Sequence, residues 1–334
     1  MNINKRAFSE GEASYFIIQT PFQAMCAINA IRQLHIDEYV ISLHLHPKTE
    51  KRNKQTVELV KMFGLVYHIE TIKPLSFLKR LGLLISNKGK YNRVFLGTHL
   101  YQDGYYHAVK EIKTGGDIVI LDDGVATVTL LKGGYKLTGK SLAYMVYFKV
   151  VASCRKISIN NLLTVYRGID NHKWNIAFND ISLLRQSPNG MDRKNIYFIG
   201  TNNSKYITGY NVEEKDFKQV LYEIFNKIKI SYPQEQIIYI PHGRDTSMFT
   251  KELCEEKGVD YKPLDINVET YMLSLGLVPR VVYGFTSSAL YNLKMLFPDS
   301  EVINIVTQLL TEKTPDILRI SNYYEKQGIP TMIV

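Results

Sequence analysis

The chain has 334 residues, of which 45% are apolar, and its 41 Lys and Arg against 32 Asp and Glu give a formal charge of +9. The length suits two domains of about 150 residues each, and the composition excludes a disordered or low-complexity chain. The positive charge favours anionic partners, whether nucleic acid, an acidic membrane surface, or phosphorylated or carboxylated substrates.

The first half of the chain alternates short apolar strands with amphipathic helices. Residues 15–20 (YFIIQT) have the composition of a buried strand, Thr20 is a suitable helix N-cap, and Pro21 is a suitable first helical residue. Further strands are predicted at 39–46, 66–71, 93–98 and 117–124, with helices at 51–64 and at about 104–113. This alternation predicts a parallel sheet with helices on both faces.

The second half repeats the alternation after a stretch, about 131–190, without a clear pattern, inside which 140–156 reads as a basic and aromatic helix. The later segments are a strand and loop at 195–203, strands at 236–240, 280–285 and 301–306, and helices at 213–232, 246–258, 269–277 and 287–297. We therefore expect two Rossmann-like α/β domains, 1–185 and 186–334, that face each other across a cleft. Ligands of such sheets bind beyond the carboxyl ends of the strands.

The cysteines and the hydropathy indicate the compartment. Cys26, Cys154 and Cys254 form neither a zinc spacing nor a disulfide framework, which is typical of a reducing compartment. No signal peptide and no window of about 18 apolar residues is present, so we expect a cytoplasmic protein. Two basic and apolar segments, 73–90 and 132–156, are either helices with solvated lysines or surfaces that dock on the inner face of the cell membrane. The aromatic residues of the second segment are also candidates for lining an acceptor groove.

Polar residues gather where predicted strands end. Asp122 and Asp123, followed by Gly124, suit proton abstraction, because repulsion and partial burial can raise the pKa of one carboxyl group; taken alone, the motif is better explained as an ordinary turn. His242, with Gly243 and Arg244, suits phosphate binding by a protonated imidazole, or else a surface turn.

Two more strand ends carry polar or flexible residues. The hydroxyls of Thr286–Ser288 precede a helix, where they form either an anion site or a plain N-cap. Gly200–Asn203 allows a ligand close to the backbone, or makes a tight turn. Each signal is weak by itself, but their coincidence at strand ends of two α/β halves indicates a base on one lobe and a phosphate site on the other.

This combination resembles the bacterial sialyltransferases and polysialyltransferases of the glycosyltransferase-B fold, which build lipooligosaccharides and capsules. Those families carry an acidic-acidic-Gly motif, a His-Pro motif and a Ser/Thr-Ser motif in this order, here Asp122–Gly124, His242–Gly243 and Thr286–Ser288. The opening IIQTPFQAMCAINAI resembles their first strand and helix, in which Thr20, Pro21 and Gln23 would enter the cleft near the acceptor. The resemblance extends from about residue 14 to about residue 310.

The resemblance implies roles for these residues. Asp122, with Asp123 as the alternative, would be the general base that deprotonates the acceptor hydroxyl. Glu269, 27 residues after His242, would contact the cytidine ribose; a favourable charge in the first turn of a helix is the alternative explanation. The full set expected at the CMP-sugar is Gly200, Thr201, Asn202, His242, Gly243, Glu269, Thr286, Ser287 and Ser288.

The implied reaction is inverting transfer of sialic acid or a related nonulosonic acid from a CMP-sugar to a glycan acceptor, either free or lipid-linked, of a bacterial surface polysaccharide or lipooligosaccharide. No cofactor and no metal is expected, since His242 and the hydroxyls would neutralise the phosphate and no Asp-x-Asp pattern occurs. His-Gly in place of His-Pro loosens the loop and leaves legionaminic, pseudaminic and Kdo-type donors open. Adjacent carboxylates on one strand point to opposite faces, which argues against a retaining glycosidase.

Two other functions remain open on the sequence. One is a different nucleotide-sugar enzyme of the same fold, such as a UDP-sugar transferase or epimerase. The other is a basic, tyrosine-rich nucleic-acid-binding protein, which the lack of any helix-turn-helix, zinc or RNA-binding signature disfavours.

Overall fold

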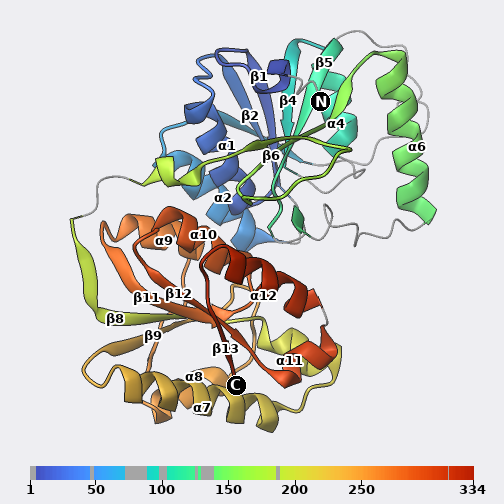
Figure 1. Ribbon diagram of the computed structural model, residues 1–334. Helices are drawn as coiled ribbons and strands as arrows, with labels where there is room; N and C mark the ends of the chain where they lie inside the picture. Colours follow the sequence, from blue (N-terminus) through green and yellow to red (C-terminus); the bar gives the residue numbers. More distant parts are fainter. Residues whose placement is uncertain are drawn as a thin grey trace. The chain divides into compact units, whose positions relative to one another are not determined.

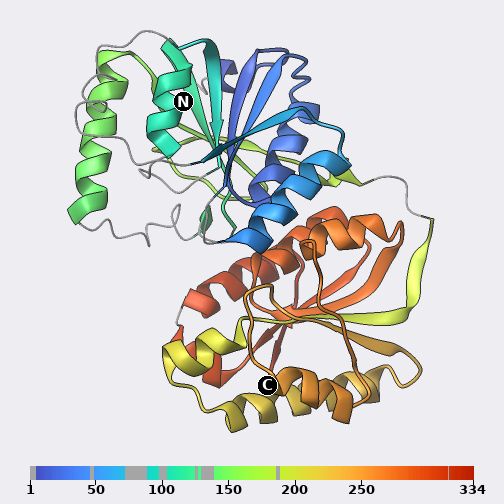
Figure 2. The ribbon, with the colours of Figure 1, turned by 180° about the vertical axis from the view of Figure 1, so that it is seen from behind.

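The computed structural model describes residues 5–45, 49–71, 89–97, 104–124, 127–128, 139–185, 189–314 and 316–334. The chain divides into two compact units, Met1–Leu183 (unit 1) and Leu184–Val334 (unit 2), where the sequence places the division after residue 185 (Figures 1 and 2). Each unit is a parallel, Rossmann-like α/β domain, which confirms the predicted fold class. The segment 73–90 lies outside the described residues, except for its last two.

Unit 1 contains a seven-stranded parallel sheet in the order β3-β2-β1-β4-β5-β6-β7. Its strands are β1 (Ser14–Ile18), β2 (Tyr39–Leu45), β3 (Tyr67–Thr71), β4 (Tyr91–Leu96), β5 (Ile112–Leu121), β6 (Ser158–Thr164) and β7 (Asn175–Phe178). The α-helices among its described residues are α1 (Pro21–Gln33), α2 (Glu50–Met62), α4 (Gly104–Glu111) and α6 (Gly139–Cys154). The strand order reverses direction between β1 and β4, which places the switch point of this sheet beside the start of α1.

The start of α1 forms as its sequence predicts. The Thr20 hydroxyl accepts a hydrogen bond from the backbone N–H of Gln23, and Pro21 occupies the first turn, where it needs no hydrogen-bond donor. The helix is buried on nearly all sides because the residues from Ala24 to Ala30 are small or apolar, apart from the buried Asn29. This fixes the entry of the chain at the switch point.

The middle of the chain differs from the predicted pattern in two places. The helix expected to reach residue 113 ends at Glu111, and β5 begins at once, because the buried Arg155 guanidinium donates to the carbonyl oxygens of Val109 and Ile112. The stretch without a clear pattern contains two more strands, β6 and β7, at the edge of the sheet. The helix expected at 140–156 is α6, which packs on the sheet through Phe148 and Val151.

Unit 2 repeats the architecture with a six-stranded parallel sheet in the order β10-β9-β8-β11-β12-β13. Its strands are β8 (Met191–Ile199), β9 (Gln236–Ile240), β10 (Asp260–Tyr261), β11 (Val278–Phe285), β12 (Glu301–Val306) and β13 (Thr331–Ile333). Its α-helices are α7 (Glu214–Ser231), α8 (Phe249–Glu256), α9 (Val268–Ser274), α10 (Ser288–Leu296), α11 (Gln308–Lys313) and α12 (Asp316–Lys326). Helices α7 and α8 cover one face of the sheet, and α9, α10 and α12 cover the other (Figure 1). Here the switch point lies between β8 and β11.

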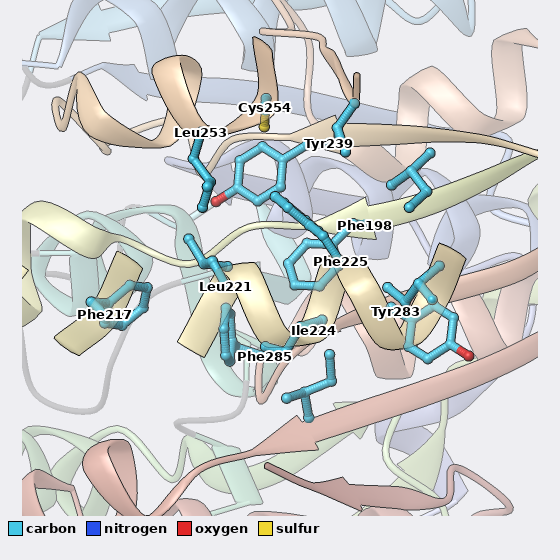
Figure 3. Packing of buried hydrophobic residues seen from close by; sticks show 14 of the residues in the cluster. Phe198, Phe217, Leu221, Ile224, Phe225, Tyr239, Leu253, Cys254, Tyr283 and Phe285 are labelled. Carbon is cyan, nitrogen blue, oxygen red and sulfur yellow. The ribbon is translucent and has the colours of Figure 1, made fainter. Parts of the chain in front are cut away.

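An aromatic core holds α7 and α8 on this sheet (Figure 3). The rings of Phe198 on β8 and Tyr239 on β9 stack with their centroids 5.3 Å apart, and Phe225 from α7 meets both rings edge-on. Phe217 and Leu221 of α7 are fully buried in the same cluster, in agreement with the amphipathic pattern of that helix. The core therefore fixes the carboxyl ends of β8 and β9 relative to each other.

Other expectations from the sequence concern cysteines and membrane segments. None of the three cysteines forms a disulfide; Cys26 and Cys254 are buried and Cys154 is exposed. No helix among the described residues has the length and apolar character needed to cross a membrane. Helix α6 exposes Val146 and Val150, while the basic residues before it, 132–138, lie outside the described part of the chain.

Candidate functional site

Three of the predicted motifs of unit 2 follow neighbouring strands of its sheet. Pro241–Asp245 follows β9, Gly200–Ser204 follows β8, and Thr286–Ser288 follows β11. Because β9, β8 and β11 are adjacent and parallel, the three loops leave the same edge of the sheet side by side. The structure therefore brings together residues that are up to 88 positions apart (Gly200 to Ser288) in the sequence.

Asp245 joins two of these loops, and the sequence analysis did not single it out. Its carboxylate accepts hydrogen bonds from the Ser204 backbone N–H at 3.0 Å, the Ser204 hydroxyl at 2.7 Å and the Asn203 amide at 2.9 Å. It also accepts from the backbone N–H and hydroxyl of Ser247, which makes a local Asx turn. The Asp-x-Ser spacing signals that turn, but no local pattern reveals a bond across 41 residues.

We expect Asp245→Ala to lower the free energy of unfolding of unit 2 by about 2–3 kcal/mol, because it leaves several donors at the loops without an acceptor. Urea unfolding followed by circular dichroism measures this change. The exposed Asp265→Ala is the matched control and is expected to remain within about 0.5 kcal/mol of the wild type. Equal stability of the two variants would show that the loops do not depend on Asp245.

His242 is half-buried and oriented by its own loop. Its Nδ1 accepts a hydrogen bond from the Arg244 backbone N–H at 3.1 Å, so that Nε2 carries the proton in the neutral ring and points away from the loop backbone. Burial and then the Arg244 charge lower the pKa of His242. The lowered pKa favours the neutral ring near neutral pH, whereas the sequence analysis expected a protonated imidazole beside a phosphate. Gly243 is exposed, and its position has room for a Cβ, so the fold does not demand glycine there.

The loop after β8 needs Gly200 for packing. A Cβ there would lie 2.4 Å from the Tyr239 hydroxyl, and the Gly200 N–H continues the strand pairing by donating to Ile240 O. Asn202 accepts from the Lys205 backbone N–H with its side chain and so starts the short helix that follows. Thr201 is half-buried beside them. The group that lies close to the backbone at Gly200 is thus the Tyr239 side chain, whereas the sequence analysis expected a ligand there.

The three hydroxyls after β11 have different surroundings. Thr286 donates to the Oδ1 atom of the buried Asn304 at 2.8 Å, which ties this loop to β12. Ser287 is the N-cap residue of α10, yet its Oγ makes no capping bond; that atom is buried and has no hydrogen-bond partner among the described residues. Ser288 is half-buried at the first position of α10. Ser287 Oγ is therefore the hydroxyl of this motif that is buried with its hydrogen-bonding capacity unused among the described residues.

Glu269 has a structural task. It is 6% exposed, and its two carboxylate oxygens accept from Asn292 of α10 at 2.7 Å and from Asn267 at 2.8 Å. These bonds hold the start of α9 against α10. The resemblance implied that this carboxylate contacts the cytidine ribose, whereas in the structure both of its oxygens bind side chains of unit 2.

The two adjacent carboxylates of unit 1 are in different environments. Asp122 is fully buried and accepts from the Thr164 hydroxyl at 2.8 Å and the Val165 backbone N–H at 2.6 Å, which fastens β5 to the end of β6. Burial raises the pKa of Asp122 to about 7, although those hydrogen bonds oppose the shift. Asp122 has no exposed surface and both of its oxygens bind other groups of unit 1, which leaves the partly exposed Asp123, the alternative from the sequence, as the better candidate for the base.

Asp123 is the carboxylate that is partly exposed. Its Oδ1 accepts from Gln23 Nε2 at 3.1 Å, while Gln23 Oε1 accepts from the Gln19 backbone N–H. Gln23 is 1% exposed and packs against Gly97, where an added Cβ atom would lie 2.8 Å from the Gln23 side chain. Gln23 was expected to enter the acceptor cleft together with Thr20 and Pro21. It is instead a buried positioning residue, Pro21 is buried too, and the Thr20 hydroxyl is used as the helix cap.

A hollow of about 950 Å³ lies along β6 and β7 of unit 1. Tyr166, Arg167, Trp174 and Asn175 are among its lining residues, and Thr164, the partner of Asp122, reaches it. It contains none of the residues that the sequence singled out, because its aromatic and amide groups are scattered through the stretch without a clear pattern.

Comparisons with known proteins support the fold. No family model and no curated protein sequence matches this chain. A solved UDP-N-acetylglucosamine 2-epimerase is similar in structure, with a TM-score of 0.50 and 9% identity over 97% of this chain and 83% of that one. A putative UDP-N-acetylglucosamine 2-epimerase from Listeria monocytogenes has a TM-score of 0.53 and 10% identity over 96% of this chain and 91% of that one. The chain therefore has the two-domain α/β fold of these proteins, the glycosyltransferase-B type.

Proposed function

We propose that this chain is an enzyme of nucleotide-sugar chemistry, a glycosyltransferase whose unit 2 binds the phosphate of the activated donor. The observation that carries the proposal is the buried Ser287 hydroxyl, which lacks a partner among the described residues at the start of α10, beside the loop that begins at Gly200. A phosphate oxygen there would accept from this hydroxyl and from the first N–H groups of the helix.

His242 supplies a second donor at the same edge of the sheet. As a neutral ring it donates from Nε2, and an approaching phosphate anion would raise its pKa and favour the charged form. Asp245 keeps the loop of His242 against the loop of Gly200, so the donors are held in place before the ligand binds. Leaving-group stabilisation of this kind serves any nucleotide-sugar reaction.

Unit 1 supplies the base in this proposal. Asp123 is partly exposed at the carboxyl end of β5, and Gln23 fixes one of its oxygens. A carboxylate in this setting deprotonates the acceptor hydroxyl as it attacks the anomeric carbon, with inversion and departure of the nucleotide. The adjacent, buried Asp122 joins the end of β5 to the end of β6 through its hydrogen bonds.

Two donor classes are supported by different observations. The order of the Asp-Asp-Gly, His-Gly and Thr-Ser-Ser motifs supports a CMP-activated nonulosonic acid and a surface glycan as acceptor. The likeness in fold to UDP-N-acetylglucosamine 2-epimerases supports a UDP-sugar, used for transfer or epimerisation. The nucleotide that binds decides between them.

The test is a set of thermal shifts of the wild type with CMP, UMP, UDP and GDP. A nucleotide present at about 100 times its Kd stabilises the folded state by about 2.7 kcal/mol, which raises Tm by roughly 5–10 °C. His242→Ala should lose most of this shift. His35→Asn is the matched control, because His35 is exposed in unit 1 with a φ of 47°, which asparagine accepts.

Each outcome has a distinct meaning. A selective shift with CMP supports nonulosonic acid transfer, and a selective shift with UDP supports a UDP-sugar enzyme. No shift with any of the four nucleotides, or a shift that His242→Ala retains in full, contradicts the proposed donor site.

A further inference from the structure

A cluster of histidines and one glutamate lies in unit 1, apart from the residues discussed above. His44 on β2 is the register partner of Glu70 on β3, so that their side chains leave the same face of the sheet. His107 reaches the same point from α4. One ligand atom from each of the three residues lies within 4.8 Å of the other two.

The individual distances suit a bound cation better than direct hydrogen bonds. His44 Nε2 lies 3.5 Å from Glu70 Oε2, and His107 Nδ1 lies 3.8 Å from the same oxygen. A good hydrogen bond would be about 2.7–3.2 Å long. Ligands about 2.0–2.1 Å from a tetrahedral zinc ion are about 3.3 Å from one another. The two distances to Glu70 exceed that spacing by about 0.2 and 0.5 Å, and since the ligand atoms lie within 4.8 Å of one another, side-chain movements of up to about 1.5 Å would bring all three to it.

His44 provides the second and independent observation. Its side chain is 1% exposed, and neither of its ring nitrogens has a hydrogen-bond partner among the described residues. Buried polar groups are nearly always paired, because leaving them unpaired in the interior is costly. A cation bound to Nε2 would satisfy the nitrogen that faces Glu70.

We propose that His44, Glu70 and His107 bind a divalent cation of the zinc class. Two imidazoles and one carboxylate are the ligand set that zinc prefers, whereas magnesium and calcium prefer oxygen ligands alone. The fourth position would be taken by water or by His68, whose Nε2 lies 3.2 Å from Glu70 Oε1. Glu70 and His68 are partly exposed, which leaves a route for the ion from solvent.

This site is independent of the proposed function, because its residues belong to unit 1 and none of them binds the nucleotide in that proposal. The ion would join β2, β3 and α4. We therefore expect it to raise the thermal stability of the protein without changing the preference for a nucleotide.

The experiment uses the full chain, freed of metal with a chelator and dialysed. Titration with Co²⁺ should give one equivalent of binding with the visible absorption of a four-coordinate site, and Zn²⁺ should displace it. Glu70→Gln and His107→Ala should each weaken Co²⁺ binding by about 100-fold or more, since even loss of a supporting residue around a metal costs 10–100-fold. His35→Asn, an exposed histidine of the same unit, should bind as the wild type does.

The variants also control for misfolding. Circular dichroism and the nucleotide shifts of unit 2 should be the same in Glu70→Gln and the wild type, since the substitution keeps the shape of the side chain. If the wild type takes up no Co²⁺ or Zn²⁺, or if both folded variants bind the ion as tightly as the wild type, the proposed site is wrong.

Discussion

Asp123→Asn is expected to reduce turnover by about 10²–10⁴-fold, the range over which a positioned general base contributes to a reaction. The reason is chemical: asparagine keeps an oxygen that can accept from Gln23 Nε2 but has no charge with which to take a proton. Binding of the nucleotide should be unchanged, because its proposed residues belong to unit 2. Turnover is measured as nucleotide released from CMP-N-acetylneuraminic acid or UDP-N-acetylglucosamine, as the thermal shifts direct, with the acceptor present.

Asp122→Asn is the matched comparison, because it makes the same chemical change one residue earlier. Asp122 is buried and bonded to Thr164 and Val165, so its effect on turnover should be smaller than that of Asp123→Asn at equal folded fraction. If Asp122→Asn proves the more damaging at the pH of the assay, the assignment of the base to Asp123 falls, and the original preference for Asp122 is restored.

The same Asp122→Asn variant is expected to change how stability depends on pH. The pKa of Asp122 is raised from 3.8 to about 7 in the folded protein, so the folded state favours the protonated carboxyl group. That contribution is fully present below the unfolded-state pKa of 3.8 and is lost as the pH rises through about 7. A shift of this size corresponds to on the order of 4 kcal/mol.

Asparagine resembles the protonated carboxyl group and does not titrate. Its oxygen would accept from the Val165 N–H, while its amide would donate to the Thr164 hydroxyl oxygen. The stability of Asp122→Asn relative to the wild type should therefore increase as the pH rises from about 4 to about 8. Urea unfolding of both proteins across this range measures the difference. Parallel stability curves would mean that Asp122 does not bury a proton.

These two experiments distinguish the roles of Asp122 and Asp123, which the sequence alone does not separate. Asp122 and Asp123 are adjacent, and both follow an apolar strand, so composition and spacing treat them alike. In the structure the pleat turns one towards β6 and the other towards Gln23 of α1. The neighbours that each side chain meets, which only the folded chain brings together, distinguish the buried Asp122 from the partly exposed Asp123 that we propose as the base.

The sequence by itself determined the two parallel α/β halves, the cap at Thr20, the amphipathic face of α7, and the placement of His242 and Thr286–Ser288 after strands. These features depend on periodicity and on residues a few positions apart. It missed β6 and β7, whose short segments carry no regular alternation.

The tertiary structure alone decided which polar groups are used and which remain available. The bonds of Asp245 to Ser204, the engagement of Glu269 by Asn292, and the approach of His107 to Glu70 all join separate elements. Such contacts depend on strand order and on how deeply each side chain is buried. The physical reason is that hydrogen bonding and pKa follow the local environment, which the folded chain builds from residues distant in sequence.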